Sequence, residues 1–340
     1  MLYKPGYVEG VLADDSRMDW SGTHSRPIKW SCWYPVPFDT LTSEHSFGGS
    51  ALHPLFTGGL VSMGAVVSDA KKEWPLVLLS HGTGGTANGL AWLATRLAQS
   101  GCICVGVDHH GNTGSEIYLP EGFICWWERT IDLSFIIDHV NQIPPIESRV
   151  NLNDISVVGF SLGGYTALSL AGAITSMKQF ENWLATDPNP SGGPREFPDL
   201  DQEIPRLISS SSRFHQSWER HGDSYLDTRV SRCVAIAPAP TVRGFVTHSL
   251  RKIDCPTLII GGEADLEAPF HSCAQWLSDQ NRSFQLKSLG EGVGHYVFLA
   301  ECTDHGICVE PEICIDAPGI VRSEIHANTA LLISDFLAAD

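Results

Sequence analysis

The chain has 340 residues, of which 39 are acidic and 22 are basic, and its formal net charge is −17 at pH 7. This charge would repel nucleic-acid phosphates and anionic membrane surfaces, so we expect neither as a partner. Hydrophobic residues make up 43% of the chain and charged residues 18%, which is typical of a folded globular protein. The length suits a single domain with elaborations, spanning residues 1–340.

The first residues lack the charged and apolar regions of a secretory signal, and no stretch of the sequence is apolar for long enough to cross a membrane. We therefore expect a cytoplasmic protein without integral membrane association. The composition does not indicate an oligomeric state.

Short apolar runs alternate with helical spacings along most of the chain. Unbroken apolar runs separated by helices indicate parallel strands that are buried on both faces. The predicted fold class is therefore α/β, with a mainly parallel central sheet flanked by helices. We expect strands over residues 7–12, 28–34, 76–79, 102–107, 155–158, 233–237, 256–260 and 284–289. We expect helices over residues 89–100, 127–140, 164–173, 205–220, 270–278 and 325–338.

Two segments interrupt this alternation. Residues 38–73 are rich in Gly and Ser and show little periodicity, which predicts a long surface excursion. Residues 176–228 are rich in Pro, Ser, Asp and Arg, and we interpret them as a cap insertion over the carboxyl edge of the sheet. The aromatic residues of this insertion are expected to shape a pocket: Trp183, Phe197, Phe214 and Trp218.

The most informative motif is Gly159-Phe160-Ser161-Leu162-Gly163, which follows the apolar run 155–158 and precedes a helical stretch. A Gly-x-Ser-x-Gly sequence at a strand-to-helix junction is how an α/β-hydrolase lifts a serine out of its sheet. Glycine is favoured on both sides of the serine because a Cβ atom would clash in so tight a turn. Ser161 is therefore the candidate nucleophile.

A serine hydroxyl needs an adjacent base, and the base needs an orienting carboxylate. In this fold the three residues occur in the order serine, acid, histidine. Asp265 suits the acid because it follows the predicted strand 256–260, and His295 suits the base because it follows the last predicted strand. The rival candidates are Glu263, Glu267 and Asp254 for the acid, and His305 and His326 for the base. His326 falls on the closing helix, where we expect a solvated or helix-terminal role.

An anionic tetrahedral intermediate needs two backbone donors, one from the residue after the nucleophile and one from a loop after an earlier strand. Leu162 would provide the first N–H and Thr83 the second, because Thr83 lies in a glycine-rich loop after the strand 76–79. The loop lacks the lysine and the spacing of a P-loop and any dinucleotide fingerprint, so no phosphate-binding role is indicated.

Several cysteine and histidine residues are candidate metal ligands. Cys302, Cys308 and Cys314 are spaced by five residues, which fits no zinc pattern, and a disulfide among them is left open. The side chains of His109 and His110 would point apart on an extended segment. The sequence therefore predicts no metal site and no cofactor.

Six motifs occur in chain order and together carry a family likeness: His81-Gly82-Thr83-Gly84-Gly85, Asp108-His109-His110-Gly111-Asn112-Thr113, Gly159 to Gly164, Asp227-Thr228-Arg229-Val230, Gly261-Gly262-Glu263-Ala264-Asp265 and Gly294-His295-Tyr296-Val297-Phe298-Leu299. As a set they resemble the bacterial predicted dienelactone hydrolases and their relatives, the platelet-activating-factor acetylhydrolases. The likeness leaves out residues 38–72 and 176–224.

This resemblance implies a serine esterase of the α/β-hydrolase fold that needs no cofactor and acts on a small-molecule ester. It also implies that Ser161, Asp265 and His295 form a catalytic triad, with Thr83 and Leu162 as the oxyanion hole. Dienelactone hydrolases proper use a cysteine nucleophile, so the serine here argues against dienelactone as the substrate. An amidase, a peptidase or a lactonase would use the same triad, and a non-catalytic binding protein on this scaffold is an alternative of another class.

Overall fold

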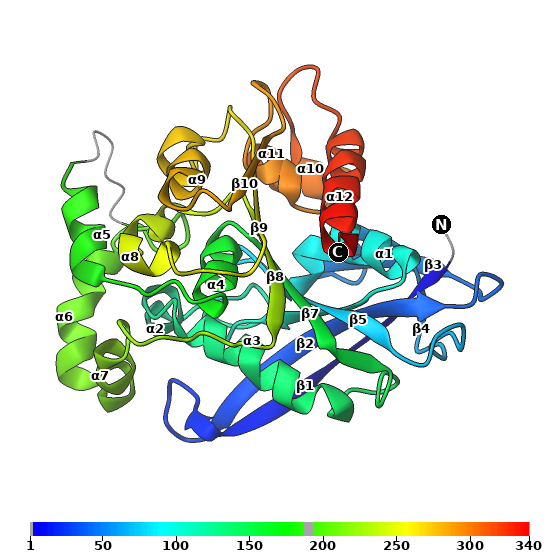
Figure 1. Cartoon of the computed structure of the whole chain (residues 1–340), viewed down its shortest axis with the longest axis horizontal. Helices are drawn as coiled ribbons and strands as arrows, with labels where there is room; N and C mark the ends of the chain where they lie inside the picture. The colour runs from blue at the N-terminus through cyan, green and yellow to red at the C-terminus, as the bar shows by residue number, and fades with distance from the viewer. Residues whose placement is uncertain (1–2, 187–192, 340) are drawn as a thin grey trace.

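The computed structural model describes residues 3–186 and 193–339, and its strands form one extended sheet (Figure 1). The order of the strands across the sheet is β10-β9-β8-β7-β5-β6-β2-β1-β4-β11, and β3 pairs with β4. The strands are β1 (Lys4–Met18), β2 (Ser25–Val36), β3 (Ser43–Ser50), β4 (His53–Met63), β5 (Trp74–Ser80), β6 (Ile103–Asp108), β7 (Val150–Phe160), β8 (Val230–Ile236), β9 (Thr257–Gly261), β10 (Gln285–Ser288) and β11 (Glu301–Cys302).

The helices connect and cover these strands. They are α1 (Ala91–Ser100), α2 (Pro120–Ile124), α3 (Glu128–His139), α4 (Leu162–Leu170), α5 (Met177–Leu184), α6 (Leu200–Ser210), α7 (Ser212–Glu219), α8 (Thr247–Leu250), α9 (Trp276–Gln280), α10 (Asp304–Val309), α11 (Pro311–Cys314) and α12 (Arg322–Ala338). Short 3-10 turns are η1 (Ala87–Leu90), η2 (Val140–Gln142), η3 (Pro240–Gly244) and η5 (Tyr296–Phe298), and η4 (His271–Gln275) is a turn of π-helix. No helix in the described ranges is both long enough and apolar enough to cross a membrane.

The strands from β6 to β10 run parallel to one another in the order β6-β5-β7-β8-β9-β10. Successive side chains of β5 enter opposite cores, because Leu76 and Leu78 pack with α3 and α4 whereas Val77 and Leu79 pack with α1 and α12. Figure 1 shows α1 and α12 beside each other on their side of the sheet. All of the predicted site residues follow the carboxyl ends of strands in this parallel half of the sheet.

The segment 38–73 differs from its prediction, since two strands occupy most of it. β4 pairs with β1 in parallel and with β11 in an antiparallel manner, and β3 forms a hairpin with β4. Three glycines of these strands, Gly48, Gly49 and Gly59, have positive φ values, and the register shifts between His45 and Ser46. These irregularities and the half-exposed faces explain why no alternating apolar pattern appears in the sequence.

The predicted insertion 176–228 contains α5, α6 and α7, and its residues 187–192 lie outside the described residues. The prediction of a single helix over residues 205–220 is wrong, because the helix is interrupted at Ser211. Ser211 is extended, with φ −119° and ψ 106°, and its hydroxyl accepts a hydrogen bond from Phe214 N at 3.2 Å. A serine that caps the second helix therefore separates two helices that one periodic pattern had joined.

Candidate active site

Ser161 lies at the sharp turn between β7 and α4, with φ 55° and ψ −118°. A positive φ is unusual for a residue with a side chain, and the surroundings hold it in place. A Cβ atom on Gly159 would lie 1.8 Å from Gly163 O, and one on Gly163 would lie 1.9 Å from Ser80 O. Ser161 N donates to Ile236 O at 2.9 Å. The two glycines thus permit the close backbone packing that projects the serine side chain from the strand end.

His295 joins Ser161 to Asp265. Its Nε2 lies 3.0 Å from Ser161 Oγ, and its Nδ1 lies 2.7 Å from Asp265 Oδ2. A carboxylate accepts hydrogen bonds, so Nδ1 carries the proton and Nε2 is left to accept from the serine hydroxyl. The other carboxylate oxygen of Asp265 accepts from Ala268 N at 2.7 Å, and the His295 ring packs on the Phe160 ring at 4.8 Å. These contacts fix the orientation of the Asp265 carboxylate and of the His295 ring.

These three side chains are nearly shielded from solvent, with exposed fractions of 7% for Ser161, 4% for Asp265 and 8% for His295. Asp265 follows β9 and His295 follows β10, so both reach the serine from the carboxyl ends of parallel strands. Both distances lie in the range expected when a serine hydroxyl is hydrogen-bonded to a base and the base to an orienting acid.

The other candidates for the acid and the base lie elsewhere. Glu263 is exposed and accepts from Ser288 Oγ at 2.5 Å, and Glu267 and His305 are also exposed. The expectation of a solvated role for His326 is wrong, because its side chain is fully buried in α12.

Leu162 directly follows Ser161, and Thr83 directly follows Gly82, which packs against Ser161. Leu162 is the first residue of α4, so its N–H has no partner within the helix. The loop that carries Thr83 comes close to the serine, because a Cβ atom on Gly82 would lie 3.2 Å from Ser161 Cβ. Neither the Thr83 nor the Leu162 N–H donates a hydrogen bond within residues 3–186 and 193–339.

Side chains from a second loop fix the shape of the Thr83 loop. Gly84 N donates to Asn112 Oδ1 at 2.7 Å, and the Tyr118 hydroxyl donates to Gly84 O at 2.8 Å. Gly84 has a φ of +63°, which a residue with a Cβ atom rarely adopts. Hydrogen bonds to both the N–H and the C=O of Gly84 therefore hold the loop.

A second serine, histidine and aspartate lie in line beneath this loop. His109 Nε2 is 2.9 Å from Ser80 Oγ, and His109 Nδ1 is 3.0 Å from Asp132 Oδ2. Each of the three side chains is completely buried. Burial, followed by the nearby Arg129 guanidinium, lowers the pKa of His109 to about 3, so its ring is neutral. Sequence reasoning missed this group, because its members come from β5, the end of β6 and α3.

His81 and Arg129 complete the support of the loop. His109 N donates to His81 Nε2 at 3.2 Å, so His81 carries its proton on Nδ1, which lies 2.6 Å from Gly82 O. Burial and the charge of Arg129 hold the pKa of His81 well below its usual value. Arg129 Nη2 donates to His81 O. Burial lowers the pKa of Arg129 to about 9, which still leaves it charged at neutral pH.

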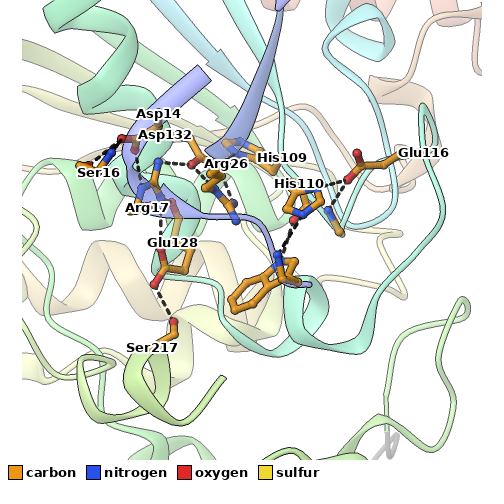
Figure 2. Close-up of polar contacts among 12 residues, drawn as sticks. Asp14, Ser16, Arg17, Arg26, His109, His110, Glu116, Glu128, Asp132 and Ser217 are labelled. Atoms are coloured by element: carbon orange, nitrogen blue, oxygen red, sulfur yellow. Dashed lines mark hydrogen bonds and ion pairs between the residues drawn. The ribbon is translucent and has the colours of Figure 1, made fainter. Parts of the chain in front are cut away.

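Asp132 is the centre of a buried ionic network, which Figure 2 shows. Its carboxylate accepts from Arg26 Nε at 2.8 Å and Nη2 at 3.0 Å, and from Arg17 Nη2 at 2.7 Å. Burial would raise the pKa of Asp132, but the two guanidinium groups hold it well below its usual value. Arg17 also binds Glu128, whose Oε1 accepts from Ser217 Oγ at 2.6 Å. The network therefore runs from Ser80 on β5 to helix α7 of the predicted cap.

His109 and His110 do not face a common ligand. His110 Nδ1 lies 2.8 Å from Glu116 Oε1, and His110 Nε2 accepts from Trp20 N at 3.3 Å (Figure 2). His109 contacts Ser80 and Asp132 instead. The two imidazoles thus point apart, as their adjacent positions predicted.

Of the three clustered cysteines, Cys302 and Cys314 form a disulfide, and Cys308 is exposed and not disulfide-bonded. The segment between them contains α10 and α11, which the sequence pattern did not reveal. The disulfide closes this segment on itself immediately after the loop that carries His295. It is a structural cross-link and leaves these thiols unavailable to bind a metal.

The parallel sheet, the helices on both of its faces and the serine turn between β7 and α4 constitute an α/β-hydrolase fold. The chain belongs to the Alpha/beta hydrolase family, whose model matches residues 76–305. Among solved structures it is similar to a ferulic acid esterase from Streptomyces cinnamoneus, with a TM-score of 0.63 and 18% sequence identity. That likeness covers 99% of this chain and 90% of the esterase chain, and it concerns the fold. No curated protein matches the sequence.

Proposed function

We propose that this protein is a serine hydrolase that cleaves a carboxylic ester through an acyl-enzyme intermediate. The observation that carries the proposal is the position of His295, 3.0 Å from Ser161 Oγ and 2.7 Å from Asp265 Oδ2. His295 takes the hydroxyl proton as Ser161 Oγ attacks the ester carbonyl. The tetrahedral intermediate then collapses, the bond to the leaving alcohol breaks, and the alcohol receives the proton from His295.

Water completes the cycle. His295 removes a proton from a water molecule that attacks the acyl carbon, and the proton returns to Ser161 Oγ as the acid product leaves. Asp265 holds the imidazole in the correct tautomer and stabilises the imidazolium that forms in each half of the reaction. These steps use only side chains of this chain, and the proposal includes no cofactor.

The proposed oxyanion hole consists of the N–H groups of Thr83 and Leu162. Two observations support it: neither group donates a hydrogen bond to a described residue, and the Gly82 backbone lies against Ser161. The amino-terminal end of α4 adds its positive dipole at the same place. Donors that are fixed before the reaction stabilise the developing oxyanion without reorganisation.

We propose that, within the Alpha/beta hydrolase family, this protein is related to the predicted dienelactone hydrolases and the platelet-activating-factor acetylhydrolases. The six motifs that occur in chain order support this relationship. The ferulic acid esterase supports ester hydrolysis only through its fold. We propose that residues 176–228 act as a cap over the acyl site and that residues 38–73 are an elaboration of one domain. The cytoplasm remains the proposed compartment, although the Cys302–Cys314 disulfide is more typical of an oxidising one.

The test is hydrolysis of a short-chain chromogenic ester by the wild-type protein and by Ser161→Ala. We expect the variant to lose turnover by at least about a thousandfold and to keep its fold, as measured by circular dichroism. Retained activity in Ser161→Ala would refute the assignment. Matched ester, amide and lactone substrates distinguish the esterase from an amidase, a peptidase or a lactonase. Failure of the wild-type protein to react with a fluorophosphonate probe would favour a non-catalytic binding protein.

A further inference from the structure

We propose that His326 is a positioning residue for the candidate base, because it fixes the backbone of the loop that carries His295. The inference rests on the proposed function, since it concerns the same base. His326 lies on α12, thirty-one residues after His295 in the sequence, and its side chain is fully buried. A fully buried histidine that takes no part in the proposed chemistry requires a structural reason, and its contacts supply one.

Buried side chains from two helices bind four consecutive carbonyl groups, those of residues 297–300, which begin two residues after His295. His326 Nε2 lies 2.8 Å from Val297 O and 3.0 Å from Leu299 O. Trp92 Nε1 on α1 donates to Phe298 O at 2.8 Å, and Arg322 Nη1 on α12 donates to Ala300 O at 3.1 Å. The loop is thus held at every residue from 297 to 300.

His326 Nε2 must carry a proton in order to donate to both carbonyl groups. Because Nδ1 has no partner among the described residues, it carries no proton, and the ring is neutral. Within the described ranges Nδ1 makes no hydrogen bond. Burial lowers the pKa of His326 to about 3, and the cations Arg96 and Arg322 act in the same direction, so the ring is neutral near pH 7. The ring stacks on the Trp92 indole, with 4.1 Å between centroids and 8° between planes. Stacking fixes the plane of the imidazole and therefore the direction of its N–H.

Arg322 is itself anchored on the far side of the loop. Its Nε and Nη2 each lie 2.9 Å from an Asp316 carboxylate oxygen, and Nη2 donates to Ile313 O at 2.6 Å. The Cys302–Cys314 disulfide joins the same segment to the end of the loop. The His326 contacts thus belong to a rigid frame, whose inner end is the short turn η5 that begins one residue after His295.

The consequence for catalysis is geometric. Proton transfer requires His295 Nε2 to remain within hydrogen-bond reach of Ser161 Oγ, and a displacement of about 1 Å can reduce a rate by about a hundredfold. His295 has two side-chain partners, Ser161 and Asp265, and neither of them fixes the backbone from which the ring projects. The carbonyl contacts made by His326 restrain that backbone.

Two substitutions separate the hydrogen bonds from the packing. His326→Phe keeps an aromatic ring against Trp92 but removes the donor, and we expect kcat to fall about 10- to 100-fold with KM changed less than about twofold. His326→Gln restores an N–H donor near Nε2, and we expect it to recover kcat to within about threefold of wild type. His248→Phe, at an exposed position on α8, is the matched control and should behave as wild type.

Three results would overturn the proposal: wild-type kcat in His326→Phe, a loss that appears only in KM, or equal losses in the Phe and Gln variants. A second readout is the pH profile of kcat/KM, in which a displaced base should shift the apparent pKa in His326→Phe but not in His326→Gln. If His326→Phe does not fold, Trp92→Phe removes the donor to Phe298 O instead, and it should lower kcat in the same way.

Ser161→Ala, measured in the same assay, separates this inference from the proposed function. An inactive Ser161→Ala together with an unchanged His326→Phe would contradict only the positioning role. An active Ser161→Ala would contradict the assignment of the nucleophile itself.

Discussion

Ser80 Oγ lies 2.9 Å from His109 Nε2, nearly the same contact that Ser161 Oγ makes with His295 Nε2 at 3.0 Å. Each imidazole also contacts an aspartate through its Nδ1. The difference between the two groups lies in their surroundings. Ser80 is completely buried at the carboxyl end of β5, whereas Ser161 stands at a turn with positive φ and is followed by the Leu162 N–H, which donates no hydrogen bond to a described residue. Distances within a triad therefore do not by themselves identify a nucleophile.

Ser80→Ala should consequently leave activity largely intact. We expect kcat/KM within about tenfold of wild type, because the hydroxyl is inaccessible to an ester and its loss affects only the support of the Thr83 loop. A fluorophosphonate probe should label wild type and Ser80→Ala equally, as measured by intact-protein mass spectrometry. Labelling that disappears with Ser80→Ala and persists with Ser161→Ala would reverse the two assignments.

Asp265→Asn should reduce kcat about a thousand- to ten-thousandfold. The amide would present an N–H group to His295 in place of the accepting oxygen at 2.7 Å, which favours the wrong imidazole tautomer. The measurement is the steady-state rate of ester hydrolysis with the fold checked by circular dichroism. Glu263→Gln, an exposed carboxylate on the same loop, is the control and should keep its activity. Equal losses in both variants would contradict the role given to Asp265.

Asp132→Asn should lower the free energy of unfolding by about 3–5 kcal/mol. The substitution removes the charge that Arg26 and Arg17 share, and it leaves the buried Arg26 guanidinium without a carboxylate partner among the described residues, whereas Arg17 keeps Asp14 and Glu128. Urea unfolding monitored by tryptophan fluorescence measures the loss. Asp69→Asn offers a matched control, because the Asp69 side chain is 90% exposed in its pair with Arg149 and its loss should cost less than about 1 kcal/mol. Similar losses for both variants would show that the buried network carries no special stability.

Stability should fall as the pH falls from about 6.5 towards 3. His109 and His326 have a pKa of about 3 in the folded protein and about 6.5 when unfolded, so between these values the unfolded chain binds more protons. Their contribution is therefore fully present above about pH 6.5 and is lost on acidification, with a slope approaching about 1.4 kcal/mol per pH unit for each histidine. Urea midpoints at pH 7, 6, 5 and 4 give this slope. His326→Phe should reduce this slope by the contribution of one histidine, about 1.4 kcal/mol per pH unit. An unchanged slope would contradict a neutral, buried His326.

The sequence was sufficient to predict the parallel half of the fold and the residues proposed for the triad. Strands β5 to β9 each contain a short, mainly apolar run where helices bury both of their faces, and their carboxyl ends meet at one edge of the sheet. Once Ser161 was placed, chain order and strand ends were enough to select Asp265 and His295.

Other features have no local signal. β3 and β4 are partly exposed strands interrupted by glycines, so their pairing depends on β1 rather than on their own pattern. His326 is a single polar residue within an amphipathic helix, and only the folded chain shows that it meets the loop after His295. The contact between His109 and Asp132 joins β6 to α3 in the same way. Such contacts depend on tertiary packing, which periodicity does not report.

The family match begins at Leu76 and ends at His305, yet the protein relies on chain beyond both limits. An excised core of residues 76–305 would lose β2, which pairs with β6, and would leave that strand edge bare and prone to aggregate. It would also lose α12, uncovering the sheet face on which Ile333 packs. A shortened version of this protein must therefore retain the hairpin of β1 and β2 and the closing helix α12. These elements and the matched core should be regarded as parts of one cooperative unit.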